Sequence, residues 1–194
     1  SNGNGKEPLR NGYIFRIASI SKTFVATAIF QLIEKGQLAL NDDINRYLNF
    51  KVSNPKYPEI PITVKMLLSH RSSINDSQGY HSFDHISPRK GKNYQSCYND
   101  YAPGEGYQYC NYNYNLLGAI IEKISGERFD VYIKKYVTGP LNLNCSFNVE
   151  QLDSNLLVPL YKYNASTKRF NLMPEAYKSY KDYLNNYRLA SYTP

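Results

Sequence analysis

Apolar residues recur at helical spacing after Ser19, and the pattern stops at Gly36. The apolar positions are Ile20, Phe24, Ala28, Ile29, Leu32 and Ile33. Glycine adopts a positive φ at no steric cost, so Gly36 is a suitable left-handed end for a helix. Ala26 and Thr27 add small residues beside the apolar positions. We therefore predict a mostly buried helix that lies between two layers rather than on a surface.

A second helical pattern begins at Asn113 and ends at Gly126. Its apolar stripe consists of Leu116, Leu117, Ile120, Ile121 and Ile124. The next helix is expected from Arg128 to about Tyr136, before Gly139-Pro140. Two helices joined by a glycine turn pack against each other, so the sequence predicts a helical hairpin.

The remaining segments predict short turns, a long loop and a β-hairpin. Residues 71–106 are rich in Gly, Ser, Asp, Asn and Pro, and loops of this length usually carry function or disorder. The other predicted elements are a turn from an Asn41 cap to Leu48, a helical turn over 64–69 capped by Thr63, and a hairpin of Leu157–Tyr163 with Arg169–Leu172.

The composition fits one soluble globular domain, or a large part of one. The chain has 194 residues, of which 42% are hydrophobic and 20% charged, which is enough apolar material for a core. The net charge of +7 could attract nucleic acid, but the densest basic group, Arg89-Lys90-Gly91-Lys92, is short and lacks interleaved aromatic residues. There is also no run of 18 apolar residues. We therefore expect no nucleic-acid partner and no integral membrane segment in this chain.

The first residues and the cysteines leave alternatives open. Residues 1–12 are expected to be a flexible leader or an expression remnant, and they contain no signal peptide.

The three cysteines, Cys97, Cys110 and Cys145, are odd in number and match no zinc-binding spacing. A Cys97–Cys110 bridge in an oxidising compartment and ordinary buried thiols are both compatible with the sequence.

The clearest candidate chemistry lies in Ser19-Ile20-Ser21-Lys22, at the start of the first predicted helix. A serine and a lysine three residues apart on a helix share one face, so the amine can reach the hydroxyl. A serine becomes a nucleophile when a neighbour takes its proton, and an amine can do so when burial or nearby positive charge lowers its pKa. The motif is weak by itself, because a capping serine followed by a surface lysine has the same spacing.

A second candidate element is Tyr109-Cys110-Asn111. Residues two apart in an extended segment point the same way, so Tyr109 and Asn111 can face one cleft. A phenol can relay a proton, and an amide can donate to a substrate carbonyl while accepting from a lysine. The alternative is an ordinary loop rich in Tyr and Asn, and the spacing alone does not separate the two interpretations.

Together these blocks resemble the penicillin-recognising serine hydrolases, in particular the branch of class C β-lactamases, DD-peptidases and related esterases. The matching segments are Phe15–Phe24 with its Ser-x-x-Lys motif, Leu67-Leu68-Ser69-His70, Pro103-Gly104 and Tyr109-Cys110-Asn111. The resemblance runs from about Phe15 to about Phe147. It implies an α/β (α+β) fold of the two-layer β-lactamase/transpeptidase type, of which residues 13–194 would hold mainly the nucleophile helix and the helical half, with much of the antiparallel sheet missing.

The resemblance also implies a role for each candidate residue. Ser19 would be the acylated nucleophile, Lys22 its general base, Tyr109 the proton shuttle to the leaving group, and Asn111 the substrate-binding residue that also orients Lys22. The backbone N–H of Ser19 would form one half of an oxyanion hole. His70 would be structural, and the Cys110 side chain would point away from the cleft. The family's site needs no metal or organic cofactor.

The sequence departs from the family pattern in the third element of the site. Lys-Thr-Gly or His-x-Gly, which in the family supplies the second oxyanion N–H, is not found, and Ser72-Ser73 stands where Ser-Gly is more usual.

We expect a serine hydrolase that acts through an acyl-enzyme on a β-lactam, a D-Ala-D-Ala-type peptide or a small ester. The expected partner is therefore a small-molecule or peptide substrate. The alternative is a catalytically silent binding module that keeps the cleft. By resemblance the location is periplasmic or otherwise extracytoplasmic.

Overall fold

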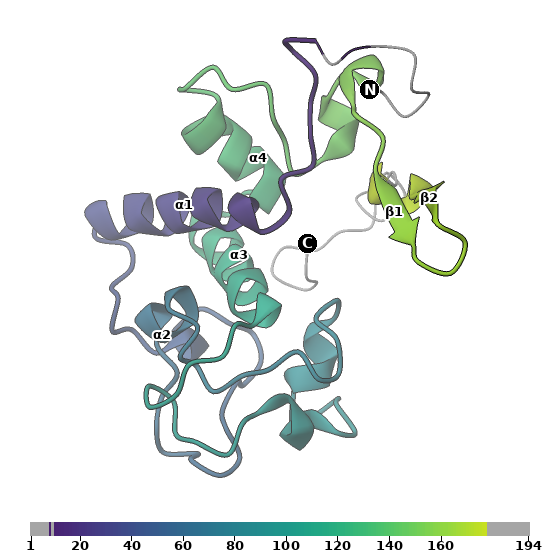
Figure 1. Ribbon diagram of the computed structural model, residues 1–194. Helices are drawn as coiled ribbons and strands as arrows, with labels where there is room; N and C mark the ends of the chain where they lie inside the picture. Colours follow the sequence, from purple (N-terminus) through teal and green to yellow (C-terminus); the bar gives the residue numbers. More distant parts are fainter. Residues whose placement is uncertain (1–7, 9, 178–194) are drawn as a thin grey trace.

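The computed structural model describes residues 8 and 10–177, whose helices gather around one central helix (Figure 1). The helices and strands are α1 (Lys22–Glu34), α2 (Val64–Leu68), α3 (Asn111–Ser125), α4 (Phe129–Ile133), β1 (Tyr161–Asn164) and β2 (Arg169–Leu172). None of the helices in the described part of the chain has the length and apolar character needed to cross a membrane.

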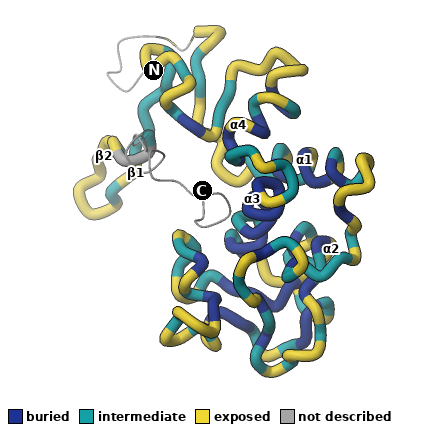
Figure 2. Tube along the Cα trace, turned by 180° about the vertical axis from the view of Figure 1, so that it is seen from behind, coloured by how far each residue is buried: buried dark blue, intermediate teal, exposed yellow. Residues whose placement is uncertain are grey.

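The central helix is α3, which contacts α1, α2 and α4. Figure 2 shows it as buried along most of its length. The predicted stripe is fully buried at Leu116, Leu117, Ile120 and Ile121. Burying a large aliphatic side chain stabilises a fold by roughly 1.5–3 kcal/mol, so this stripe is a main source of stability. The helix ends at Gly126, whose φ of 70° is the predicted left-handed stop.

Helix α1 buries one face and leaves the other open. Its buried residues are Val25, Ala28, Ile29 and Leu32. On the opposite face Thr27 is exposed and Phe30 is 48% exposed. The predicted extent of the helix is close to the observed one, since a 3-10 turn over Ala18–Ser21 leads into α1 and Gly36 has a φ of 68°. The prediction of cover on both sides is wrong for the described residues, because the face with Thr27 and Phe30 is exposed.

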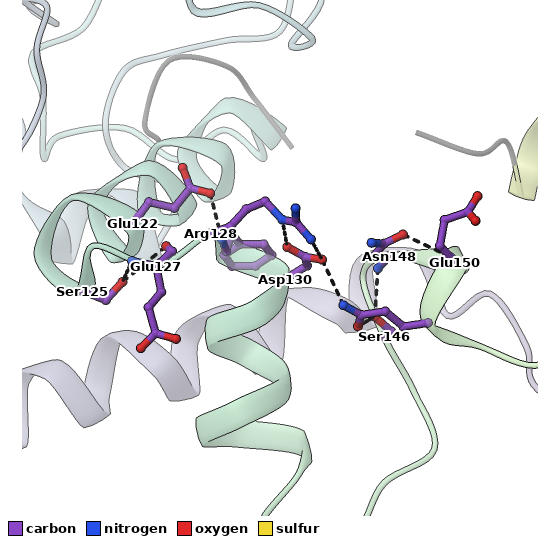
Figure 3. Close-up of polar contacts among 10 residues, drawn as sticks. Glu122, Ser125, Glu127, Arg128, Asp130, Ser146, Asn148 and Glu150 are labelled. Carbon is purple, nitrogen blue, oxygen red and sulfur yellow. Dashed lines mark hydrogen bonds and ion pairs between the residues drawn. The ribbon is translucent and has the colours of Figure 1, made fainter. Parts of the chain in front are cut away.

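The hairpin of α3 and α4 is held by buried polar contacts (Figure 3). Glu122 on α3 accepts a hydrogen bond from the backbone N–H of Phe129 at 2.7 Å, so it satisfies a free donor at the start of α4. Arg128 pairs with Asp130, which also accepts a hydrogen bond from Gln151 at 3.3 Å. These contacts tie the hairpin to the segment that leads to the β-strands. The second helix is shorter than predicted and continues as a π-helical turn over Lys134–Thr138.

Residues 71–106 form an ordered loop with 3-10 helices at Phe83–Ile86 and Tyr94–Cys97. Its two arms pair with each other, because the N–H of Asn75 donates to the carbonyl of Cys97 at 2.8 Å and the N–H of Asn99 donates to the carbonyl of Ser73 at 2.7 Å. Buried Phe83 and Ile86 join the hydrophobic core. This packing anchors the loop in the core that it shares with α3.

The predicted helix caps are partly correct. Thr63 caps α2 as predicted, by accepting from a backbone N–H of its first turn. The turn after residue 41 is a 3-10 helix over Ile44–Arg46, and its cap is Asp43, which accepts from the N–H of Asn45 at 2.9 Å. Asn41 is therefore not the cap, because the extended backbone at Asp43 lets the nearer carboxylate reach the free N–H.

The predicted β-hairpin forms, with β1 and β2 antiparallel and Tyr161 opposite Leu172, but its first strand begins at Tyr161 and not at Leu157. It forms the small sheet of the described chain and is largely exposed (Figures 1 and 2). Ile14, before the first helix, forms a single parallel bridge with Leu157. Most of the expected leader, at residues 1–7 and 9, and the tail from residue 178 lie outside the described residues.

Candidate active site

Ser19 lies in the 3-10 turn over Ala18–Ser21, just before α1. The preceding residue, Ala18, has a φ of 46°, a left-handed conformation that costs about 1–2 kcal/mol for a residue with a Cβ. Strained backbone of this kind is concentrated at functional sites, where the surrounding structure holds it in place. Ser19 is exposed, so its hydroxyl is accessible to a ligand.

Lys22 connects the other three predicted site residues. It is the first residue of α1, and its Nζ lies 3.1 Å from Ser19 Oγ. The same amine donates to the Tyr109 hydroxyl at 2.6 Å and to Asn111 Oδ1 at 2.9 Å. The structure therefore brings together all four residues that the sequence singled out.

Tyr109 contacts both the hydroxyl and the amine, because its own hydroxyl also lies 2.6 Å from Ser19 Oγ. The Nζ of Lys22 is 4.8 Å from the centre of the Tyr109 ring, within cation–π distance. Burial raises the pKa of Tyr109, but the hydrogen bonds from Lys22 and Ser19 and the charge of Lys22 outweigh it. The net result is a pKa below the usual tyrosine value of about 10.

His70 supports the segment that carries Tyr109. The two rings lie against each other with centroids 4.5 Å apart. The carbonyl of His70 accepts from the N–H of Gln108 at 3.0 Å, and Nδ1 accepts from the N–H of Cys110 at 3.2 Å. Desolvation, followed by the charge of Lys22, lowers the pKa of His70, which favours the neutral ring with a lone pair on Nδ1. These contacts agree with a supporting role for His70.

Asp76 is the residue of this site that sequence reasoning missed. Its Oδ2 accepts from the backbone N–H and the side-chain Nδ2 of Asn111, at 2.8 and 2.9 Å. Its Oδ1 accepts from the N–H of Tyr112 at 3.2 Å. No sequence signal marks Asp76, which is a single acidic residue in a polar loop, 35 positions before Asn111. The packing of that loop alone brings it to the start of α3.

Cys110 separates two site residues in sequence, but its side chain is buried and directed to Asp76. The thiol donates to Asp76 Oδ1 at 3.1 Å. Cys97 is also buried, with its thiol 3.6 Å from the carbonyl of His85. Both thiols are free, so the Cys97–Cys110 bridge is not formed and the alternative of buried thiols describes the structure. Burial raises the pKa of both groups, which makes them poor nucleophiles.

A hollow of about 530 Å³ lies on another side of the turn that holds Ser19. Its lining includes Ser21 and several apolar residues, among them Phe15, Ile17, Phe24, Phe147 and Leu157. Ser19, Lys22 and Tyr109 do not line it. The two serines of the motif therefore have different surroundings.

Among residues 8 and 10–177, no group of three or more His, Cys, Asp or Glu is placed to hold a metal ion.

Known proteins resemble this chain over most of its length. The Beta-lactamase family model matches residues 1–180. Penicillin-binding protein 4* of Bacillus subtilis is 33% identical over 147 residues, which cover 72% of this chain and 31% of that protein. Esterase EstB of Burkholderia gladioli is 29% identical over 157 residues, which cover 72% and 40%. The chain thus spans roughly a third of the length of these relatives.

Solved structures share the fold. The octameric penicillin-binding protein homologue from Pyrococcus abyssi matches 90% of this chain and 40% of its own, with a TM-score of 0.64 and 29% identity. The match confirms the expected fold class, in which the described residues hold the helices and a small two-stranded sheet. Together with the family match over residues 1–180, it shows that the chain belongs to the Beta-lactamase family.

Proposed function

We propose that this chain carries the nucleophile of a serine hydrolase that works through an acyl-enzyme. The observation that supports it best is the Tyr109 hydroxyl, which lies 2.6 Å from both Ser19 Oγ and Lys22 Nζ. At such distances a proton can pass directly between the three groups. A capping serine followed by a surface lysine would have no phenol as a third partner, so this contact favours an activated nucleophile over the ordinary interpretation of the motif.

In the proposed acylation, the uncharged form of the Lys22 amine takes the proton of Ser19 Oγ while that oxygen attacks an acyl carbonyl. Tyr109 relays that proton to the departing amine or alcohol, which leaves an ester on Ser19. A water molecule then attacks the ester and gives a proton to the same groups. The bond between the acyl carbon and Oγ breaks, the acid leaves, and these groups return the proton to Ser19. The backbone N–H of Ser19 is proposed to stabilise the oxyanion of both steps, as one half of the oxyanion hole.

Asn111 is the proposed substrate-binding residue. Its Oδ1 accepts from Lys22, and one N–H of its Nδ2 is directed to Asp76. An amide nitrogen carries two N–H bonds, so a second donor is available for the carbonyl of a substrate amide. The side chain could therefore orient Lys22 and an acyl donor together.

The proposed substrates are a β-lactam, a D-Ala-D-Ala-type peptide or a small ester. The relatives named above include a penicillin-binding protein and an esterase, which supports this range of acyl donors. Substrates of the cell-wall type are met outside the cytoplasm, and we propose an extracytoplasmic location for this chain on that ground.

Covalent labelling tests the proposal. The protein, expressed at the full length that its gene encodes, is treated with a penicillin and with a fluorophosphonate, and its peptides are analysed by mass spectrometry. We expect an adduct on Ser19 that is absent in Ser19→Ala. Lys22→Ala should lower the labelling rate about 100-fold or more, since general-base catalysis contributes about that much.

Ser21→Ala is the matched control for this experiment. Ser21 lies in the same turn but lines the apolar hollow, so its loss should leave labelling unchanged. An adduct that survives Ser19→Ala contradicts the proposal. Absence of any adduct in the unaltered protein also contradicts it and is the result expected of a catalytically silent binding module.

A further inference from the structure

We propose that Asp76 is a positioning residue that fixes the side chain of Asn111 and, through it, the place of the Lys22 amine. The inference rests on the proposed function and extends it to a residue outside the sequence motifs. Asp76 lies in the loop over residues 71–106 and contacts Asn111 through both the backbone and the side chain. It touches neither Ser19 nor the amine through any hydrogen bond observed in the described residues, so its effect would be indirect.

The first argument concerns the orientation of the Asn111 amide. An asparagine side chain has similar shape in two orientations, which exchange an acceptor and a donor. An ionised carboxylate only accepts, so Asp76 requires the Nδ2 of Asn111 to face it. The Oδ1 then faces Lys22, whose amine donates to it at 2.9 Å. The carboxylate thereby selects the one orientation that can hold Lys22.

The second argument concerns the start of α3. The residue at its N-cap position, Cys110, makes no side-chain capping bond. Asp76 accepts from the backbone N–H groups of Asn111 and Tyr112 instead, which are free donors of the first helical turn. A negative charge is also favourable at this end of a helix. Asp76 therefore fixes the backbone that carries Asn111 as well as its side chain.

The third argument concerns Asp76 itself, which is held by its loop. The carbonyl of Asp76 accepts from the N–H of Gly79 at 2.9 Å, and the preceding residue, Asn75, is paired with Cys97 across the loop. The carboxylate is partly buried. A hydrogen bond from an amide to a carboxylate also polarises the amide, which makes Oδ1 a stronger acceptor for the amine.

The test compares second-order rates of Ser19 labelling by a fluorophosphonate in variants of the complete protein. Asp76→Ala and Asp76→Asn should each lower the rate about 10- to 100-fold, because a displacement of about 1 Å at a catalytic group costs up to 100-fold. Asp84→Asn is the matched control, since Asp84 belongs to the same loop but pairs with Lys90 on the surface. Its rate should stay within about twofold of the unaltered protein.

A reversal experiment separates positioning from a purely structural cap. Asn111→Asp places two carboxylates against each other and should lower the rate strongly. Adding Asp76→Asn removes the repulsion and restores an amide–carboxylate pair in the opposite sense, so the double variant should label at least about fivefold faster than Asn111→Asp alone. A structural cap alone would make the double variant slower than Asn111→Asp.

The outcomes distinguish this inference from the proposed function. No labelling of the unaltered protein would overturn the proposed function. Normal labelling of the unaltered protein together with normal rates in both Asp76 variants would overturn the role of Asp76 and leave the proposed function standing. A double variant slower than Asn111→Asp would also overturn it, and thermal unfolding of each variant confirms that the rates refer to folded protein.

Discussion

The hydroxyl of Tyr109 contacts Ser19 and Lys22 at the same distance, 2.6 Å, and neither contact follows from the Tyr-x-Asn spacing. The spacing predicts only that Tyr109 and Asn111 face the same side. In the structure both side chains contact the Lys22 amine. The position of the hydroxyl depends on the ring, which packs against His70. A phenol held in this way releases its proton more readily than an ordinary tyrosine, which suits a proton relay.

The rate of Ser19 labelling by a penicillin, whose departing amine needs a proton, should fall as the pH rises through the pKa of Tyr109. The proposed relay needs a phenol proton to give to the leaving group, and that proton is lost above the pKa. Burial raises this pKa, but the contacts with Lys22 and Ser19 lower it by a larger amount. The midpoint of the fall should therefore lie below pH 10. Tyr109→Phe should lower the rate about 100-fold or more and remove this fall. Labelling rates between about pH 6 and pH 11 measure both effects.

Tyr107→Phe is the control for the pH profile. Tyr107 lies two residues away and is 69% exposed, so its phenol should not take part in the relay. Its variant should keep the rate and the fall at high pH. A fall that persists in Tyr109→Phe would mean that another group carries the proton.

Among the elements, the loop over residues 71–106 contains a non-glycine residue with a positive φ, Ser73. Ser73 has a φ of 63°, which glycine adopts more easily than serine. Its Oγ accepts a hydrogen bond from Asn54 Nδ2 at 3.0 Å, and its carbonyl accepts from Asn99. The serine at this position, where the family usually has glycine, thus gains a buried hydrogen bond while its backbone is strained.

Ser73→Gly should destabilise the protein less than Ser73→Ala, by about 1 kcal/mol in the free energy of unfolding. Both changes remove the hydrogen bond to Asn54, at a cost of about 1 kcal/mol. Glycine alone relieves the positive φ, and its greater freedom in the unfolded chain offsets part of that gain. Urea unfolding followed by circular dichroism measures the difference. The opposite order would argue that the backbone at residue 73 is not strained in solution.

The same elements show what the sequence could predict. The ends of α1 and α3 near Gly36 and Gly126 follow from local rules, because periodic apolar residues and a glycine with positive φ need no distant partner. The open face of α1 and the contact of Asp76 with α3 depend on which segments pack together. Asp43, and not Asn41, caps the 3-10 helix over Ile44–Arg46, because neighbouring polar residues compete for one free N–H. Motifs predict the four candidate site residues, whereas no motif marks Asp76.

On the scale of the whole molecule, the site is assembled from three distant segments. Ser19 and Lys22 come from the start of α1, Asn111 from the start of α3, and Asp76 from the loop between α2 and α3. The hydroxyl of Ser19 meets Tyr109 across 90 positions of sequence. The packing of α1 on α3 and the closure of the loop must therefore both be complete before the site can form.

The net charge of this chain should affect which labelling reagent reaches Ser19 faster. The chain carries a net charge of +7, and its field attracts anions at a range set by the salt concentration. A penicillin carries a carboxylate, whereas a fluorophosphonate with an uncharged linker is neutral. We expect the second-order labelling rate with penicillin to fall about threefold between roughly 0.01 M and 0.5 M salt. The rate with the neutral reagent should change little.

Comparing the two reagents on one protein cancels any effect of salt on the fold or on Ser19 itself. Both reagents would report such an effect equally, so only the ratio of their rates measures the attraction of the anion. A ratio that does not change with salt would contradict a contribution of net charge to substrate capture. A ratio that falls with salt and is unchanged in Lys56→Gln, whose exposed amine already pairs with Asp100, would exclude this surface cation as the source of the attraction.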